Sequence, residues 1–296
     1  MSILNIVARL KSREEIERLV DLGVDVLMID TKDLTTKSLF PFDQNDLSEI
    51  DQLIKNYDVN LYVYVNKMIH ENDLENLNQW MKLFKTVDVD GIVINDFTVY
   101  VVAKDHGLEN KVIYQPGTMN TNTFDAMFLE GKIKGMTLSK EITLEEILEI
   151  VKSPSKINYS LVGHGYIDMF YSKRKLITNY FIHKNRKFHK IKGNHHFVLE
   201  EKTRDNIYYP ILEDQIGTHI FRDKKLISFD EIDHIKEYIT DFFIERLFID
   251  DEEYYDTIQA YQNKELQDIF LNRYKNFNNG FYYLPTEKTK GERHVD

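Results

Sequence analysis

Short apolar runs alternate with longer amphipathic segments along the first half of the chain. The apolar runs are rich in β-branched residues and have the length of strands, at residues 3–9, 26–30, 61–66, 91–95, 111–115, 135–139 and 158–164. The intervening segments carry apolar residues at helical spacing, at residues 12–22, 46–56, 72–87, 98–105, 123–130 and 143–151. This alternation predicts repeated βα units around a parallel sheet.

Two of the predicted helices begin with a capping-box pattern. Ser12 is followed three residues later by Glu15, and Thr143 by Glu146. In such a box the hydroxyl and the carboxylate each accept a hydrogen bond from a backbone N–H that the first helical turn leaves unpaired. We therefore expect helices to begin at both places.

An eighth strand is predicted at residues 241–247, after the amphipathic stretch 229–239. Eight parallel strands in an α/β chain predict a TIM-type (β/α)8 barrel, which needs roughly 250 residues. Residues 1–250 are accordingly predicted to form the barrel, with residues 166–228 as a long insertion between strands seven and eight.

The insertion and the tail have patterns of their own. Residues 206–210 and 217–227 have the pattern of extended or hairpin segments. Residues 251–296 are predicted to be a C-terminal helical extension built on one long helix over residues 252–277. Its tyrosines are expected to form the packing face of that helix, at Tyr254, Tyr255 and Tyr261.

Composition places the chain among ordinary globular proteins and excludes several chemistries. It has 296 residues, 42% of them hydrophobic and 29% charged, with a formal net charge of −11. It contains no cysteine, which excludes disulfides, a thiolate nucleophile, a zinc–thiolate site and a cysteine-bound iron–sulfur cluster within this chain. No signal peptide or membrane-spanning run is recognised, so we expect a cytoplasmic protein that does not contact membranes.

One stretch departs from the acidic character of the chain. Residues 169–199 contain no Asp or Glu, and aromatic residues are interleaved with the cations Lys173, Arg174, Lys175, Lys184, Arg186, Lys187, Lys190 and Lys192. Cations neutralise phosphates and aromatic rings stack on unpaired bases, so one interpretation is an RNA-binding surface. The other is a solvated loop that packs over an acidic surface, and the sequence leaves both open.

The histidines of the same stretch do not predict a metal site. Their spacing matches no tetrahedral pattern, and the neighbouring lysines would repel a cation, at His183, His189, His195 and His196. We expect no metal in this chain.

Polar residues stand at the end of every predicted strand. They are Arg9, Asp30, Asn66, Asn95, Asp96, Gln115, Ser139, Lys140, Glu141, His164, Glu245 and Arg246. Parallel barrels carry their chemistry at the carboxyl ends of the strands. The joint occurrence of both charge signs and several amides therefore predicts a binding cavity rather than strands that simply end in solvent.

Candidate catalytic residues come from the last strand ends. His164 lies between two glycines and is a candidate general base, because an imidazole titrates near neutral pH. A structural histidine at a turn is the alternative. Lys140 and Glu141 are candidates to orient or protonate a substrate, or to form surface ion pairs. The motifs of dinucleotide-binding proteins, P-loop proteins, zinc proteases and α/β-hydrolases are absent.

The stretch from Leu161 to Phe181 resembles the characteristic motif of peptidase family U32, the collagenase-like proteins. The family pattern is similar to HGALCxxYSGRCLLSNY, and the matching residues are His164, Gly165, Tyr171, Ser172, Arg174, Leu176, Asn179 and Tyr180. Further landmarks follow in order along the chain, among them Asn66, Asp96, Asn122, the LSKE of residues 138–141, and Ile244-Glu245-Arg246. The resemblance implies a TIM barrel with an inserted region.

The resemblance also implies which residues serve the site. Landmark positions of the family suggest substrate binding by Asn66, Asp96, Asn122, Tyr171, Arg174, Glu245 and Arg246. Many relatives hold an iron–sulfur cluster with cysteines, and the two positions inside the motif are Asp168 and Lys175 here. The resemblance therefore implies that this chain binds no cluster.

A short member without cysteine is similar to the smaller of two paralogues that low-GC Gram-positive bacteria encode together. That pair is implicated in prephenate-dependent 5-hydroxylation of the wobble uridine of tRNA. We therefore expect a cluster-less subunit that works with a cluster-bearing paralogue and binds tRNA or a small carboxylated metabolite. One alternative is a collagenase-like peptidase, a hydrolase for which no nucleophile is recognised beside His164. A second alternative is a non-catalytic scaffold for the paralogue.

Overall fold

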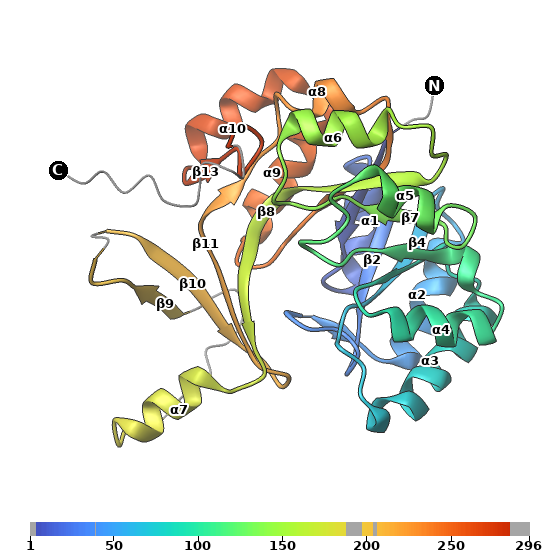
Figure 1. Cartoon of the computed structure of the whole chain (residues 1–296), viewed down its shortest axis with the longest axis horizontal. Coiled ribbons are helices and arrows are strands. Elements are labelled where there is room, and N and C mark those ends of the chain that lie inside the picture. The colour runs from blue at the N-terminus through green and yellow to red at the C-terminus, as the bar shows by residue number, and fades with distance from the viewer. Residues whose placement is uncertain (1–3, 39, 188–196, 204–205, 285–296) are drawn as a thin grey trace.

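Eight parallel strands close into a barrel (Figure 1). The computed structural model describes residues 4–38, 40–187, 197–203 and 206–284. The barrel strands are β1 (Asn5–Arg9), β2 (Val26–Thr31), β4 (Asn60–Val65), β5 (Gly91–Ile94), β6 (Val112–Tyr114), β7 (Gly135–Thr137), β8 (Asn158–Ser172) and β12 (Ile239–Ile244). They are hydrogen-bonded in this order, and β12 pairs with both β8 and β1, which closes the sheet. The predicted TIM-type barrel is confirmed.

Helices surround the barrel, one after each of its first strands. They are α1 (Ile16–Asp21), α2 (Gln44–Ile54), α3 (Leu74–Val87), α4 (Phe97–Asp105), α5 (Thr123–Leu129) and α6 (Leu144–Val151). A short strand β3 (Pro41–Phe42) pairs with the end of β2. None of the helices in the described ranges is long and apolar enough to cross a membrane.

The barrel strands are apolar on both faces because each face is buried. Inside the barrel, side chains such as Val7, Met28, Tyr62 and Phe243 form one cluster. The opposite faces of the strands pack against the helices in a larger cluster. Strands buried on both sides read as continuous apolar runs rather than as alternating ones, which explains why the sequence pattern located them.

Strand β8 continues beyond its predicted end and leaves the barrel. It bends at Gly165, whose φ of +111° is unfavourable for other residues and whose missing Cβ would lie 2.7 Å from Cβ of Glu245. Its outer half forms an antiparallel sheet in the order β8, β11 (Thr218–Leu226), β10 (Tyr208–Glu213) and β9 (Phe197–Glu200), with the helix α7 (Leu176–His183) alongside. We call residues 166–226 the arm, which projects from the barrel at the lower left of Figure 1.

The extended segments predicted inside the insertion are confirmed, whereas the single long helix of the tail is wrong. The chain forms α8 (Ile232–Ile235) before β12, then α9 (Asp251–Gln262), α10 (Gln267–Arg273) and the short β13 (Phe277–Asn278). Helix α9 ends because Asn263 is extended (φ −132°, ψ 109°) and its side chain accepts a hydrogen bond from the N–H of Glu265. An asparagine in that conformation begins a new helical turn.

The tyrosines of α9 pack as the sequence predicts. Tyr254 and Tyr255 are buried in the core between helices and sheet, and Tyr261 packs on its edge.

One of the two predicted capping boxes forms. The side chain of Thr143 accepts a hydrogen bond from the N–H of Glu146, and the carboxylate of Glu146 accepts one from the N–H of Thr143. The box at Ser12 is wrong, because Ser12 makes no capping hydrogen bond. Glu15 accepts instead from the N–H of Lys11 and from the guanidinium of Arg246.

Candidate functional site

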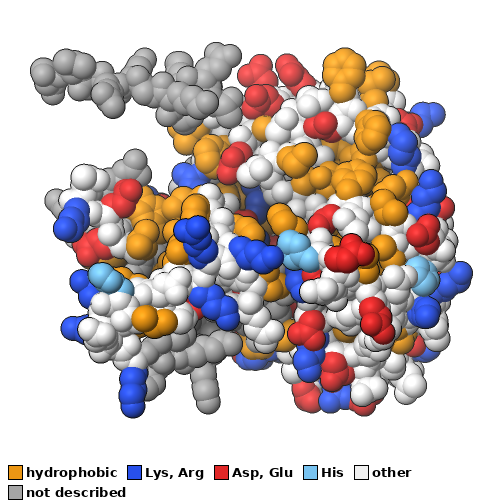
Figure 2. All heavy atoms as spheres, turned by 60° about the horizontal axis from the view of Figure 1, so that its bottom comes forward, with side chains coloured by type: hydrophobic (Ala, Val, Ile, Leu, Met, Phe, Trp, Pro, Cys, Tyr) orange, Lys and Arg blue, Asp and Glu red, His pale blue; other side chains and the backbone are white. Residues whose placement is uncertain are grey.

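A cavity of about 280 Å³ lies at the carboxyl ends of the barrel strands. Residues from strand ends and from the arm line it, among them Arg9, Lys37, Tyr64, Gln115, Lys140, Asp168, Tyr171 and Glu245. Parallel barrels place their chemistry at this end. In Figure 2, which brings this side forward, Lys and Arg side chains gather where the arm meets the barrel.

Asp168 joins two lysines on one side of the cavity. Its Oδ2 lies 3.0 Å from Nζ of Lys37 and its Oδ1 lies 2.7 Å from Nζ of Lys140. Burial opposes ionisation of this carboxyl, but Lys140 and Lys37 hold its pKa well below the ordinary value. The group is therefore a charged bridge with one net positive charge.

Arg9 forms a second charged group in the wall of the cavity. Its guanidinium lies 3.1 Å from Oδ1 of Asp30 and 3.3 Å from Oε2 of Glu245, and it stacks over the ring of Tyr64 at 4.5 Å. Burial disfavours its charge, yet Asp30 and Glu245 raise the pKa of Arg9 above its ordinary value. The hydroxyl of Tyr64 donates to Oε1 of Gln115 at 2.9 Å, which orients both side chains.

The arm holds Lys37 in place. Lys37 has a left-handed backbone (φ +57°), and its N–H donates to Oδ2 of Asp214, at the turn between β10 and β11. The preceding N–H, of Thr36, donates to Oδ1 of Asn66 at 2.7 Å. Nε2 of His219 lies 3.3 Å from Oδ2 of Asp214. The position of Lys37 thus depends on the insertion as well as on the barrel.

Six of the residues that the sequence analysis singled out for a binding cavity or site line this cavity, namely Arg9, Asn95, Gln115, Lys140, Tyr171 and Glu245. Asn66 is buried beside it and fixes the loop that carries Lys37. Asp96 and Asn122 cap α4 and α5 through backbone N–H groups. At both positions the polar side chain accepts a hydrogen bond from an N–H group in the first turn of the following helix, so it caps that helix.

Two further predicted residues lie outside the lining. The N–H of Glu141 donates a hydrogen bond to Oγ of Ser139, and the side chain of Glu141 is not part of the cavity wall. Arg174 is exposed on the arm, and its carbonyl accepts a hydrogen bond from Thr218.

His164 belongs to β8 but lies away from the cavity, against α9, α10 and β13. Its ring is fully buried and packs against Tyr261, Phe270 and Phe277, at centroid distances from 5.7 to 6.2 Å. Burial, together with the charge of Lys225, lowers its pKa to about 3. The position matches the structural alternative, since a neutral, enclosed imidazole cannot reach a substrate at the barrel mouth.

The burial of His164 predicts an acid-dependent loss of stability. The unfolded chain binds a proton at this residue near the ordinary pKa of 6.5, whereas the folded chain binds it only near 3. Stability from this residue is therefore complete above pH 6.5 and falls by about 1.4 kcal/mol per pH unit below it. We expect the excess stability of the wild type over His164→Gln to shrink by about 2 kcal/mol between about pH 7 and pH 5. Denaturant unfolding measures this. The matched control is the exposed His234, changed in the same way.

Arg246 is also placed outside the cavity, in a buried ion-pair network. Its guanidinium donates to Oε2 of Glu15 and to Oδ1 of Asp251, each at 2.7 Å, and to the carbonyl of Arg9 at 3.2 Å. These contacts tie β12 to α1 and α9. Nη1 and Nη2 of the guanidinium both donate to protein acceptors, which indicates a structural role.

The predicted RNA-binding cations that the structure describes lie on the arm. Those that the structure describes are exposed, at Lys173, Lys175, Lys184, Arg186 and Lys187. Nζ of Lys173 lies 2.8 Å from Nε2 of His70, next to the barrel mouth. Lys190 and Lys192 fall outside the described residues.

Two charged residues of the cavity could not be predicted as such from the sequence, Lys37 and Asp168. Lys37 stands in a loop with no pattern of its own. Asp168 was noticed only as a position where relatives have cysteine. Its role in the cavity depends on Lys37 and Lys140, which lie 131 and 28 residues away along the chain.

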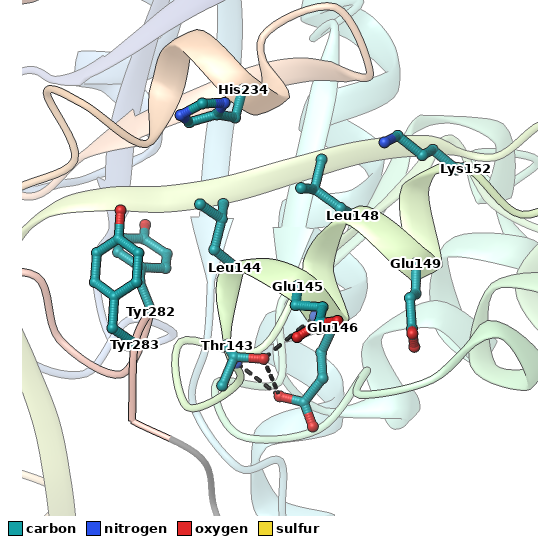
Figure 3. A pocket seen from close by; sticks show the side chains of 10 residues that line it. All are labelled: Thr143, Leu144, Glu145, Glu146, Leu148, Glu149, Lys152, His234, Tyr282 and Tyr283. Carbon is teal, nitrogen blue, oxygen red and sulfur yellow. Dashed lines mark hydrogen bonds between the residues drawn. The ribbon is translucent and has the colours of Figure 1, made fainter.

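A larger hollow of about 970 Å³ lies elsewhere, against the outer side of α6. Figure 3 shows Tyr282 and Tyr283 on one side of it, side chains of α6 on the other, and His234 from α8 nearby. Glu145, Glu146 and Glu149 contribute acidic groups, and Glu146 is engaged in the helix cap. It lies away from the strand ends, so we place the candidate site in the smaller cavity.

The fold and the cavity define a TIM-type barrel with a charged mouth and a projecting arm. The sequence model of peptidase family U32 matches residues 11–283, so the chain belongs to that family. A tRNA hydroxylation protein P2 of Bacillus subtilis is 26% identical over 227 residues, covering 76% of this chain and 73% of that protein. An uncharacterized protease of Methanocaldococcus jannaschii is 25% identical over 303 residues, covering 91% and 70%.

A solved structure supports the fold. A U32 peptidase superimposes with a TM-score of 0.51 at 13% identity, covering 82% of this chain and 93% of that one. The thiolate-bound cluster that the family resemblance implies for relatives does not fit here, because the chain has no cysteine. Of the two motif positions, Asp168 is engaged with lysines and Lys175 is exposed at the start of α7.

Proposed function

We propose that this chain takes part in 5-hydroxylation of the wobble uridine of tRNA. It would act as a subunit without an iron–sulfur cluster, together with a cluster-bearing paralogue, and its cavity would bind a small carboxylated metabolite such as prephenate. The observation that carries the proposal is the placement of an exposed basic arm beside a cavity with cationic walls. The similarity to a tRNA hydroxylation protein supports it.

The cavity offers donors suited to a carboxylate. Lys37 and Lys140 share a single carboxylate, that of Asp168, so two ammonium groups face one acid. Arg9 is only 7% exposed, and its Nε makes no hydrogen bond within the described residues, although it lies 3.3 Å from Oε2 of Glu245. The ammonium groups of Lys37 and Lys140 are therefore the donors that an incoming carboxylate would meet.

The cellular test is deletion of the gene. Hydroxylated wobble uridine in total tRNA should fall, as measured by mass spectrometry of nucleosides, and unchanged levels would refute the proposal. Co-purification from the native host should recover the paralogue together with this chain.

The exposed cations of the arm predict that the purified chain binds tRNA with an affinity that depends on salt. Replacing Arg174, Lys184, Arg186 and Lys187 by alanine should weaken tRNA binding at least roughly tenfold and flatten its dependence on salt, because each lost phosphate contact lowers the slope by about 0.7 to 0.9. The control replaces four exposed lysines outside the arm, Lys55, Lys82, Lys104 and Lys132, with the same change in net charge. Equal losses for the two sets would contradict a role specific to the arm.

A further inference from the structure

The arm is a single antiparallel sheet with a helix on one face. Helix α7 is fastened to that face by its first turn, since the N–H groups of Ile177 and Thr178 donate to Oε2 of Glu213, and that of Leu176 donates to Oγ1 of Thr218. Glu213 and Thr218 are paired neighbours on β10 and β11. Side chains alternate between the two faces of a strand, so the neighbours of Glu213 along β10 and of Thr218 along β11 point to the opposite face of the sheet.

The opposite face carries a stacked pair of rings beside the cavity. The register aligns Tyr171 of β8 with His219 of β11, and His219 with Leu212 of β10. The rings of Tyr171 and His219 stack at 4.9 Å with an interplanar angle of 25°. His219 is 3% exposed, with its Nε2 at 3.3 Å from Oδ2 of Asp214, whereas Tyr171 is 40% exposed and lines the cavity. Tyr171 is therefore a supported ring with its remaining surface available to a ligand.

We propose that Tyr171 is the platform on which an unpaired nucleobase stacks at the mouth of the cavity. This inference rests on the proposed function and adds how the nucleotide is held. A base inside a helical stack is out of reach of a cavity, so an enzyme must receive it unstacked, and aromatic side chains are the usual support for such a base. The rigid backing of His219 keeps the platform in place without the ligand.

The surrounding charge favours a nucleotide over other planar ligands. Ser172 follows the platform directly, and the next residues are Lys173, Arg174 and Lys175. All three cations are exposed, and no acidic residue occurs between positions 169 and 199. In a chain of net charge −11, this local excess of cations beside an exposed ring matches a base joined to a phosphate backbone.

The test uses an RNA stem-loop with the sequence of a tRNA anticodon arm and 2-aminopurine at the wobble position. Binding to the full chain should quench the fluorescence of the 2-aminopurine through stacking. Tyr171→Leu should abolish the quenching and weaken binding roughly tenfold, which is within the range for the loss of one stacked base. Tyr171→Phe keeps the ring and should retain both. Tyr238→Leu is the matched control, since Tyr238 is 38% exposed and precedes β12 at the other end of the barrel.

The outcomes separate this inference from the function on which it rests. Binding by the wild type with quenching that survives Tyr171→Leu would overturn the platform and leave the tRNA role intact. A wild type that does not bind the stem-loop would overturn both. Loss of quenching in Tyr171→Phe as well as in Tyr171→Leu would show that the hydroxyl matters rather than stacking, and would also overturn the platform.

Discussion

Lys140→Met is expected to remove most of the hydroxylated wobble uridine from a deletion strain complemented with the variant. Under the proposed function, Lys140 binds the carboxylate of the small metabolite, and a charge-assisted hydrogen bond of this kind contributes about 1.5–3 kcal/mol. Losing it corresponds to roughly a 10- to 150-fold weaker site. The measurement is mass spectrometry of nucleosides from total tRNA.

The matched control for this prediction is Lys132→Met. Lys132 is exposed and lies over the ring of Phe128, away from the cavity. The two variants change the net charge equally, so a difference in modification between them arises from the place of Lys140 in the cavity. If Lys140→Met restores the modification as fully as the wild type does, the cavity is not the functional site.

Arg246→Met is expected to lower the free energy of unfolding by about 3–5 kcal/mol, because it leaves a buried carboxylate without its cation. The side chains of Arg246 and Glu15 are 3% and 5% exposed, and Nη1 of Arg246 lies 2.7 Å from Oε2 of Glu15. Methionine retains most of the apolar volume of the arginine, so the loss reports the charge. Denaturant unfolding measures the change.

Arg273→Met provides the comparison for Arg246→Met. Arg273 also pairs with two carboxylates, those of Glu252 and Asp256, but its side chain is 49% exposed. Solvent screening limits such pairs to about 1 kcal/mol or less. Similar losses for the two variants would show that burial does not determine the importance of the Arg246 network.

Most of the barrel could be predicted from the sequence, and the reason is local. Strands buried on both faces form apolar runs that need no partner to be recognised, and all eight were located. The capping box at Ser12 failed because Glu15 is engaged by Arg246, a residue more than 200 positions away. The tail helix failed because a single residue, Asn263, adopts an extended conformation.

The candidate site was predictable only in part. Lys140, Tyr171 and Glu245 stand at strand ends or in a family motif, and they line the cavity. His164 and Arg246 satisfy the same criteria, yet both side chains are buried outside the cavity. The packing of segments that are distant in sequence decides whether a side chain at a strand end faces the cavity or the helices outside the barrel.

By itself, the sequence determined the eight-stranded barrel, the family and the lack of cysteine ligands in this chain, because these follow from local patterning, a motif and composition. The tertiary structure decided which polar residues meet. It placed Asp168 between Lys37 and Lys140, set Tyr171 on His219, and buried His164. Each of these depends on the closure of the barrel and on the bend of β8 into the arm, which bring together residues that no local pattern connects.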